Sequence, residues 1–507
     1  MNACLIRGRY VIVDADAPVL EHAALLVDEG RITAIGPYAT LRVQAPGLPV
    51  IGSERHLVLP GFVNAHFHGK GLGSFQLGFL DDQLELWILE RKAQRPVDAY
   101  LDTLLSTANL IESGVTSVLH SHVMRDPTRY ENELERVLGA YQEAGLRVAF
   151  APDIRWRNNF VYESDDRFAA LLPQPLRACF ERHIGTLAPV VPDRYYSAFD
   201  GLVARVGLAG PRHRLLYGPL SLQWTGDAEM REIARRAADY GTGLHIHVQE
   251  SPYQFDLGPR TYGHSIVRQL DKLGALTPKT TLAHAVWLTD NDLDLLAQRG
   301  ASYAHNLSAN LRLKSGISPV LRAREKGVNV AIGTDSMTIN DDEDYVQEMR
   351  LVAKMHRPPG IDEPALSSRD VLRMATRNGR KAVLFDDVGV LGAGGPADVV
   401  TMRLDRMLDQ LHAPGFDPVD LLLYRGKRED IDHVLVAGEC LLAGGRLTKI
   451  DKARTLDALR EEAARYAVAP PPDTRRLMDE LRPHLVRYYA TWFREHGEPH
   501  YVFNSRV

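Results

Sequence analysis

Short apolar segments alternate with amphipathic segments eight times between residues 59 and 335, and this alternation constrains the fold more than any other feature. Most of the amphipathic segments end on a glycine, as helices with a left-handed C-terminal cap do. Eight strand–helix units predict an α/β protein whose parallel strands close into a TIM-like (β/α)₈ barrel. An open doubly wound sheet is the alternative, but no obvious GxGxxG turn follows the first strand to favour it. The eight expected strands are 59–68, 116–120, 146–152, 213–219, 242–248, 280–285, 301–306 and 328–335.

Strand patterns of a different kind occupy both ends of the chain. Residues 1–58 contain alternating apolar runs without a helical pattern of useful length, and similar runs return at 391–450. We expect these two segments to form one small β-sandwich domain beside a barrel of residues 59–390. Residues 451–507 have a helical pattern that the prolines at 470–472 interrupt, which predicts a C-terminal helical extension.

Composition excludes several classes of protein. The 507 residues carry a net charge of only −5, which gives no support to a nucleic-acid binder with a basic face. Cys4, Cys179 and Cys440 lie far apart and form no CxxC pattern, which argues against a disulfide framework or a thiolate zinc site. Neither a secretory signal nor an apolar run long enough for a membrane helix occurs, so we expect a cytoplasmic protein without a membrane partner.

Imidazoles and carboxylates gather at the carboxyl ends of the expected strands. Since these ends meet at one mouth of a barrel, residues far apart in the chain can form one site there. Three neutral imidazoles and one carboxylate are suitable ligands for a divalent cation such as zinc. The alternative for each residue alone is a hydrogen-bonded histidine near a strand end. The candidate residues are His66 and His68 after the first strand, His247 and Glu250 after the fifth, His284 on the sixth, and Asp335 after the eighth.

Several ordered motifs resemble one known family. The segments "LPGFVNAHFH", "HIHVQE", "LAHAVWLTD", "HNLSANLRLKSG" and "GTDS" are similar to the metal and catalytic motifs of the amidohydrolase superfamily. They resemble most its branch with one metal ion, which includes cytosine, guanine and S-adenosylhomocysteine deaminases and triazine hydrolases. The resemblance extends over roughly residues 5–445.

The resemblance implies roles for the candidate residues. It makes His66, His68, His247 and Asp335 the metal ligands, and it makes Glu250, His284 and Asp335 the catalytic residues. Members with two metal ions carry a bridging lysine at the end of the fourth strand, where this chain reads "HRLLYGPLSLQW" without a lysine. We therefore expect one divalent ion per chain, Zn²⁺ or, as the alternative, Fe²⁺.

Four further residues are candidate substrate contacts. His120 and His122 end the second expected strand. Three roles stay open for them: contact with substrate, support of the metal site, or no role beyond that of polar residues at a solvated barrel mouth. Asn306 and Ser336 lie in motifs where this chain departs from its relatives: Leu307 replaces a common proline, and Ser336 replaces a common glycine. In the family the loop that contains Ser336 faces the substrate.

The resemblance and the candidate site together predict a hydrolase that cleaves a C–N bond with metal-activated water. The leading hypothesis is an aminohydrolase that deaminates a small heterocyclic amine, working as a homodimer or larger homo-oligomer. The enzymatic alternatives are hydrolysis of an acyclic urea, carbamate or amide, or dechlorination of a triazine. A barrel-based binding protein without catalysis is a further alternative, against which Glu250 and His284 argue because a scaffold has no need of them.

Overall fold

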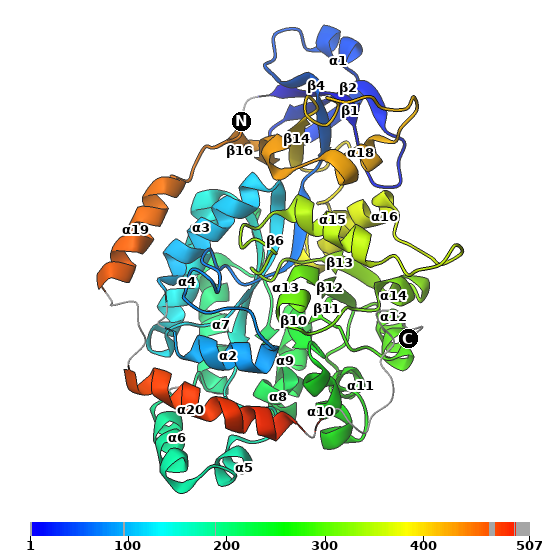
Figure 1. The fold of residues 1–507 in the computed structure, drawn as a ribbon. Coiled ribbons are helices and arrows are strands. Elements are labelled where there is room, and N and C mark those ends of the chain that lie inside the picture. Colours follow the sequence, from blue (N-terminus) through cyan, green and yellow to red (C-terminus); the bar gives the residue numbers. More distant parts are fainter. Residues whose placement is uncertain (1–2, 95–96, 188, 466–471, 491, 493–507) are drawn as a thin grey trace.

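The computed structural model describes residues 3–94, 97–187, 189–465, 472–490 and 492, and its largest part is a barrel of parallel strands inside a layer of helices (Figure 1). Each of the eight strands expected from the sequence overlaps a barrel strand, so the (β/α)₈ prediction is confirmed. The fourth is divided into two short pieces, the second of which ends on Pro219, a residue that cannot donate to a ladder. In chain order they are β5 (Phe62–Phe67), β6 (Val115–His122), β7 (Arg147–Ile154), β8 (His213–Leu215) with β9 (Gly218–Pro219), β10 (Leu244–Val248), β11 (Thr280–His284), β12 (Ser302–His305) and β13 (Asn329–Ile332).

The strands pair in parallel around the barrel. One ladder runs β5–β6–β7–β8, with β9 also beside β7, and a second runs β10–β11–β12–β13. A parallel bridge between Tyr217 and Leu244 connects the two ladders on one side. On the other side the backbone N–H groups of Thr334 and Asp335 donate to the carbonyl oxygen of His66. This second connection holds the end of the last strand against the end of the first, where the candidate ligands lie.

Amphipathic helices cover the outside of the barrel, with apolar side chains turned to the strands. Gly145, Gly241 and Gly300 cap three of these helices in the left-handed conformation, as the glycine pattern predicts. The helices around the barrel are α3 (Ala99–Glu112), α4 (Tyr130–Ala144), α7 (Pro192–Val206), α9 (Asp227–Tyr240), α11 (Ile266–Lys272), α12 (Asp290–Arg299), α14 (Val320–Glu325), α15 (Tyr345–Met355), α16 (Ser368–Ala375) and α17 (Arg380–Val383). The segments that lead from the strands to these helices contain α2 (Leu84–Lys92), α5 (Asp165–Ala170), α6 (Gln174–Thr186), α8 (Leu222–Thr225), α10 (Pro252–Tyr262) and α13 (Leu307–Arg312).

Strands from both ends of the chain form one eight-stranded sheet at the top of Figure 1, in the order β17-β16-β15-β14-β4-β1-β2-β3. The antiparallel pair of β14 with β4 joins the two ends, and the buried Ile6, Leu25, Val58 and Val399 pack in its core. These strands are β1 (Cys4–Val11), β2 (Leu20–Asp28), β3 (Arg31–Pro37), β4 (Val50–Pro60), β14 (Val399–Arg403), β15 (Ile431–Val436), β16 (Glu439–Ala443) and β17 (Arg446–Leu447). The helices α1 (Tyr38–Gln44) and α18 (Pro418–Arg425) accompany the sheet.

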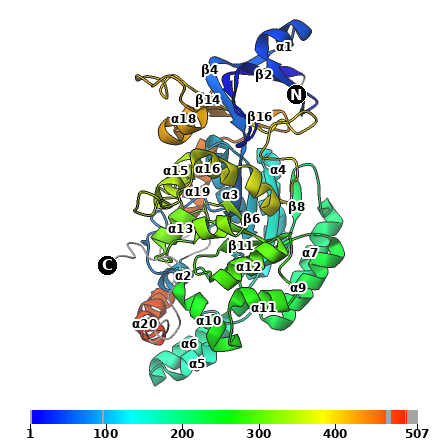
Figure 2. The same cartoon turned by 90° about the vertical axis from the view of Figure 1, so that its right-hand side faces the viewer.

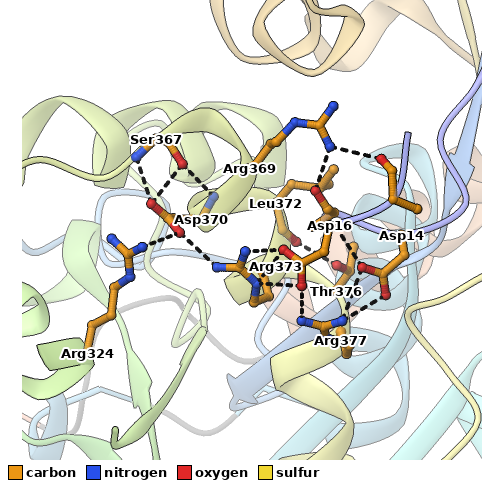
Figure 3. A network of polar contacts seen from close by, with 12 residues as sticks. Asp14, Asp16, Arg324, Ser367, Arg369, Asp370, Leu372, Arg373, Thr376 and Arg377 are labelled. Carbon is orange, nitrogen blue, oxygen red and sulfur yellow. Dashed lines mark hydrogen bonds and ion pairs between the residues drawn. The ribbon is translucent and has the colours of Figure 1, made fainter. Parts of the chain in front are cut away.

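Ion pairs connect the sheet to the barrel layer, and Figure 2 shows the two stacked along the length of the molecule. In Figure 3 the loop after β1 presents Asp14 and Asp16 to Arg373 and Arg377, on α16 and in the turn after it. Arg373 also pairs with Asp370 of α16 at 2.8 Å. These ion pairs are partly exposed to solvent, so each adds little to the free energy of folding. Their main effect is to orient the sheet relative to the barrel.

A buried ion pair makes a second connection, and it carries a testable stability prediction. Arg147 of β7 donates from Nε to Asp398, which precedes β14, at 2.7 Å, and both side chains are buried. Arg147→Met leaves the Asp398 carboxylate buried without its cation, so we expect it to lower the free energy of unfolding by about 3–5 kcal/mol. Urea unfolding measures the change. Arg235→Met is the control, because Arg235 is exposed and pairs at the surface with Glu232 and Asp239. An equal midpoint shift in both variants would contradict the prediction.

Two helices follow the sheet at the end of the chain. The helix α19 (Lys452–Arg465) lies along α3, and α20 (Pro472–Tyr489) crosses α2 on the far side of the barrel from the sheet (Figure 1). Arg475 and Arg482 of α20 form ion pairs with Glu90 of α2 and with Asp82 just before it. The rest of the predicted extension, residues 466–471, 491 and 493–507, lies outside the described residues. None of the described helices is both long and apolar enough to cross a membrane.

Candidate metal centre and active site

The candidate metal ligands meet at the mouth of the barrel that faces away from the small sheet. His66 and His68 come from the end of β5, His247 from β10, and Asp335 from the loop after β13. One ligand atom of each lies within 4.8 Å of the others. The Nε2 atoms of His66 and His68 each lie 3.0 Å from the same Asp335 oxygen, and Nε2 of His247 lies 3.3 Å from Nε2 of His68. The structure thus brings together all four residues that the sequence predicts as ligands.

Hydrogen bonds on the far side of the rings show that these atoms present lone pairs to one another. Nδ1 of His68 donates to the carbonyl oxygen of Ser121 at 2.6 Å, and Nδ1 of His247 donates to that of Leu220 at 2.9 Å. A neutral imidazole has one N–H, so the Nε2 atom of each ring has only its lone pair. Lone pairs 3.3 Å apart and beside a carboxylate repel each other unless a cation lies between them. The residues present therefore fit a divalent metal ion.

Burial keeps these histidines neutral. It lowers the pKa of His68 to about 3 and the pKa of His247 well below its usual value. Imidazoles that stay neutral at physiological pH are ready to bind a metal without releasing a proton. His245, on the same face of β10 as His247, places Nε2 at 2.8 Å from Nδ1 of His66 and so orients that ring.

Glu250 and His284 lie next to the ligands. Glu250 Oε1 is 3.6 Å from His284 Nδ1, and His284 Nε2 is 3.9 Å from the second Asp335 oxygen. Asn310 accepts from His284 Nδ1 at 2.9 Å, which leaves Nε2 of that ring facing the ligand site. Burial raises the pKa of Glu250 to about 7, so its carboxyl group can both give and take a proton near neutral pH.

The backbone is strained where these residues leave their strands. His284, Asp335 and Ser336 have positive φ values of 68°, 58° and 58°. Residues other than glycine seldom adopt this backbone conformation. Strain of this kind costs of order 1–3 kcal/mol per residue and persists only where the surroundings enforce it. Here it turns the side chains of His284 and Asp335 from the strand ends into the site.

The four predicted substrate contacts are placed differently, because none of them lies on the wall of the cavity at the site. His120 is bonded to the Tyr141 hydroxyl at 2.9 Å, and His122 lies 2.9 Å from a Glu133 oxygen. The Ser336 hydroxyl accepts from the backbone N–H of His68 at 3.1 Å, and the Asn306 side chain is buried without a hydrogen-bond partner among the described residues. Their contact with substrate stays a prediction that this placement does not support.

A cavity of about 450 Å³ opens above the candidate ligands, a size suited to a small organic molecule. Lys70, Trp87, Arg91, Lys92 and Arg155 line it, and the sequence reasoning missed all five. Trp87 and Arg91 lie four residues apart on α2 and so share one face of that helix. That spacing, and the position of Lys70 two residues after His68, were the signals that could have identified them.

Comparisons with known proteins agree with this geometry. The profile described as "Amidohydrolase family" matches residues 57–191 and 213–441, and one described as "Imidazolonepropionase-like composite domain, bacteria" matches residues 23–47. The chain therefore belongs to the amidohydrolase family, as the motifs predict.

Curated relatives resemble nearly the whole chain. A 5'-deoxyadenosine deaminase from Methanosarcina acetivorans is 30% identical over 471 residues, which are 91% of this chain and 98% of the relative. A 5-methylthioadenosine/S-adenosylhomocysteine deaminase from Nitratidesulfovibrio vulgaris is 29% identical over 469 residues, 90% and 96% of the two chains.

Solved structures share the fold. An atrazine chlorohydrolase from Arthrobacter aurescens TC1, complexed with zinc, has a TM-score of 0.74 and 25% identity, and the match covers 90% of this chain and 99% of the other. An adenosine deaminase from Xanthomonas campestris with bound zinc has a TM-score of 0.76 and 24% identity, over 91% and 98%. The zinc complexes of these similar barrels agree with the donor set found here, which fits a single divalent ion.

Proposed function

We propose that the protein is a zinc-dependent aminohydrolase that removes the amino group of an adenine-type heterocycle as ammonia. The observation that carries the proposal is the arrangement of Glu250 and His284 beside four converging ligand atoms at the floor of a cavity. A site for metal alone needs no buried carboxyl group whose pKa is raised to about 7. The deaminases among the relatives, identical at 29–30% of positions along most of the chain, support the choice of heterocycle.

Each residue has a separate task in the proposed reaction. His66, His68, His247 and Asp335 would hold the zinc ion, which supplies a Lewis acid that lowers the pKa of water. Asp335 accepts a proton from the attacking water, and His284 orients the attacking oxygen and stabilises the charge that develops on it. Glu250 delivers a proton to the leaving nitrogen. The new C–O bond replaces the C–N bond, so the products are a carbonyl compound and ammonia.

The same residues can serve other leaving groups. Hydrolysis of a triazine substituent is the second candidate, favoured by the likeness to the atrazine chlorohydrolase structure. Hydrolysis of an acyclic urea, carbamate or amide has no comparable support among the relatives described above. A binding protein without catalysis is disfavoured because Glu250 and His284 lie within reach of Asp335.

Ammonia release from zinc-loaded protein tests the proposal. The substrates are adenosine, 5'-deoxyadenosine and S-adenosylhomocysteine, with guanine, atrazine and an acyclic urea for comparison. We expect ammonia from at least one of the adenine compounds. Chloride release from atrazine without any ammonia would support the second candidate instead, and inactivity toward all six compounds would contradict the proposed reaction.

The quaternary structure and the location in the cell remain predictions. We propose a homodimer or larger assembly in the cytoplasm, and the three free cysteines, Cys4, Cys179 and Cys440, support a reducing compartment. Light scattering of the purified protein measures the mass of the assembly, and a mass of one chain would contradict the oligomer.

A further inference from the structure

The cavity above the ligand site has a surplus of positive charge. Five cationic side chains line it against four carboxylates, one of which is the ligand Asp335, and a divalent ion at the site increases the surplus. Arg125 is balanced within the protein, since it pairs with Asp102 at 2.9 Å. The surplus therefore lies with the other cations of the wall.

Three of these, Arg91, Lys92 and Arg155, form what we call the cation cluster. Arg91 and Lys92 end the helix α2, and Arg155 directly follows β7. No ion pair joins any of the three to a carboxylate within 4.0 Å in the described part of the chain. All three side chains are half-buried. Removing a cation from water without a counter-charge is costly, so three such cations in one wall indicate a site for an anion that the protein itself does not supply.

Aromatic rings and backbone groups hold the cluster in place. The Arg155 guanidinium lies 4.2 Å from the centre of the Trp224 ring, and the Lys92 ammonium lies 4.9 Å from that of Phe160. Arg155 donates to the carbonyl oxygens of Asn158 and Asn159, whereas its Nε is buried without a partner. Such contacts orient the cations while leaving donors free for a ligand.

The cations of the wall also repel one another. Burial lowers the pKa of Arg91 to about 10, and the charge of Arg125 adds to this effect. Burial lowers the pKa of Lys92 well below its usual value, and the charge of Arg155 acts in the same direction. An anion among these groups would relieve that repulsion. Asp153, on the same wall, does not take this role, because its carboxylate accepts from the backbone N–H of Met124 and burial raises its pKa to about 6.

We infer that the substrate is a heterocyclic amine with an anionic substituent, a phosphate or a carboxylate, which the cation cluster binds while the amino-bearing carbon lies at the metal ligands. The inference rests on the proposed function and narrows its substrate class. Arg91 and the ligand Asp335 line the same cavity, so one molecule can contact both the cluster and the ligand site. Trp87 and Trp224, which also line the wall, offer flat surfaces for the ring system.

Pairs of substrates that differ in charge test the inference. Adenosine and adenosine 5'-monophosphate differ by a phosphate, and 5'-deoxyadenosine and S-adenosylhomocysteine differ by an amino-acid group with a carboxylate. We expect kcat/KM to be at least about tenfold higher for one of the two compounds that carry an anionic group than for its partner without that group, mainly through a lower KM. Which pair shows the preference distinguishes phosphate from carboxylate.

Variants connect the preference to the cluster. Arg91→Met and Lys92→Met keep an unbranched side chain but remove its charge, and we expect each to lower the ratio of kcat/KM with and without the anionic group at least roughly fivefold. Arg157→Met is the matched control, because Arg157 lies two residues after Arg155 but is exposed and off the cavity wall, and it should leave the ratio unchanged. The internal ratio corrects for any loss of folded protein.

The outcomes separate this inference from the proposed function. Ammonia from the uncharged compounds alone, or a ratio unchanged in both cluster variants, overturns the anionic substrate and leaves the deaminase intact. If no compound releases ammonia, the proposed function fails, and calorimetric titration with adenosine 5'-monophosphate and S-adenosylhomocysteine decides the inference. Binding of either compound that weakens at least roughly fivefold in Lys92→Met supports it. Binding of neither, or equal binding by wild type and variant, overturns it.

Discussion

Glu250→Gln lowers turnover by at least roughly a hundredfold while the protein keeps its fold and its metal. Glutamine preserves the shape of the side chain, but it cannot transfer a proton to the leaving nitrogen. Removing a positioned general acid–base typically costs 10²–10⁴-fold in rate. Single-turnover kinetics with the best substrate, thermal melting and metal analysis together measure the outcome.

Glu348→Gln is the matched control for this variant. Glu348 is another buried glutamate whose pKa burial raises to about 7, but it binds Ser308 and lies off the cavity wall. We expect Glu348→Gln to affect stability rather than chemistry. Turnover near that of the wild type in Glu250→Gln would contradict the proton-transfer role, and loss of metal in that variant would make Glu250 a ligand.

Asp335→Asn removes both metal and activity. One Asp335 oxygen lies 3.0 Å from Nε2 of His66 and of His68, so the carboxylate supplies the negative charge of the ligand set as well as the proposed base. An amide is a weaker ligand and accepts no proton near neutral pH. We expect the metal content to fall well below one ion per chain and turnover to fall by more than about a hundredfold, measured by elemental analysis and single-turnover kinetics.

The comparison with Glu250→Gln makes this second prediction specific. Both variants lose a carboxylate at the same site, but only Asp335→Asn should lose the ion. Full metal content in Asp335→Asn would show that the three histidines suffice for binding, and Asp335 would then be a base alone.

The barrel could be predicted from the sequence because its signal is repeated. Each strand is short and apolar, each following helix is amphipathic, and the period changes between them along the chain. Convergence of His66, His247 and Asp335 then follows from the geometry of a parallel barrel, whose strand ends meet at one mouth. The joined sheet of the chain ends is a weaker prediction, because the pairing of β14 with β4 spans more than 300 residues and no local pattern specifies it.

The sequence did not show which face of the second barrel strand carries His120 and His122. Alternate residues of a barrel strand face the interior or the helices, so a position at the strand end does not by itself place a side chain in the mouth. His120 and His122 share the face of β6 that meets α4, where Tyr141 and Glu133 bind them. To know whether these histidines point to the same side as His68, one needs the register of β5 against β6. That register contains irregularities, so the sequence alone does not give it.

The cation cluster could not be predicted from the sequence for another reason. Arg91 and Lys92 end an ordinary amphipathic helix, whose charged residues usually face solvent. They are half-buried because α2 lies over the mouth, held there by ion pairs of Glu90 with Arg475 and of Asp82 with Arg482 of α20. Contacts of this kind depend on the assembled molecule, so neither periodicity nor motif spacing reveals them.

Ammonia release as a function of bound zinc tests whether the four-ligand site is the catalytic centre. The protein is stripped with a chelator, reloaded with increasing zinc, and assayed at each step with its best adenine-type substrate. We expect the stripped protein to be inactive, and we expect activity to rise with zinc to a maximum at about one ion per chain, because the described residues contain one set of four ligands. Full activity without metal, or a maximum only at two ions per chain, would contradict this expectation.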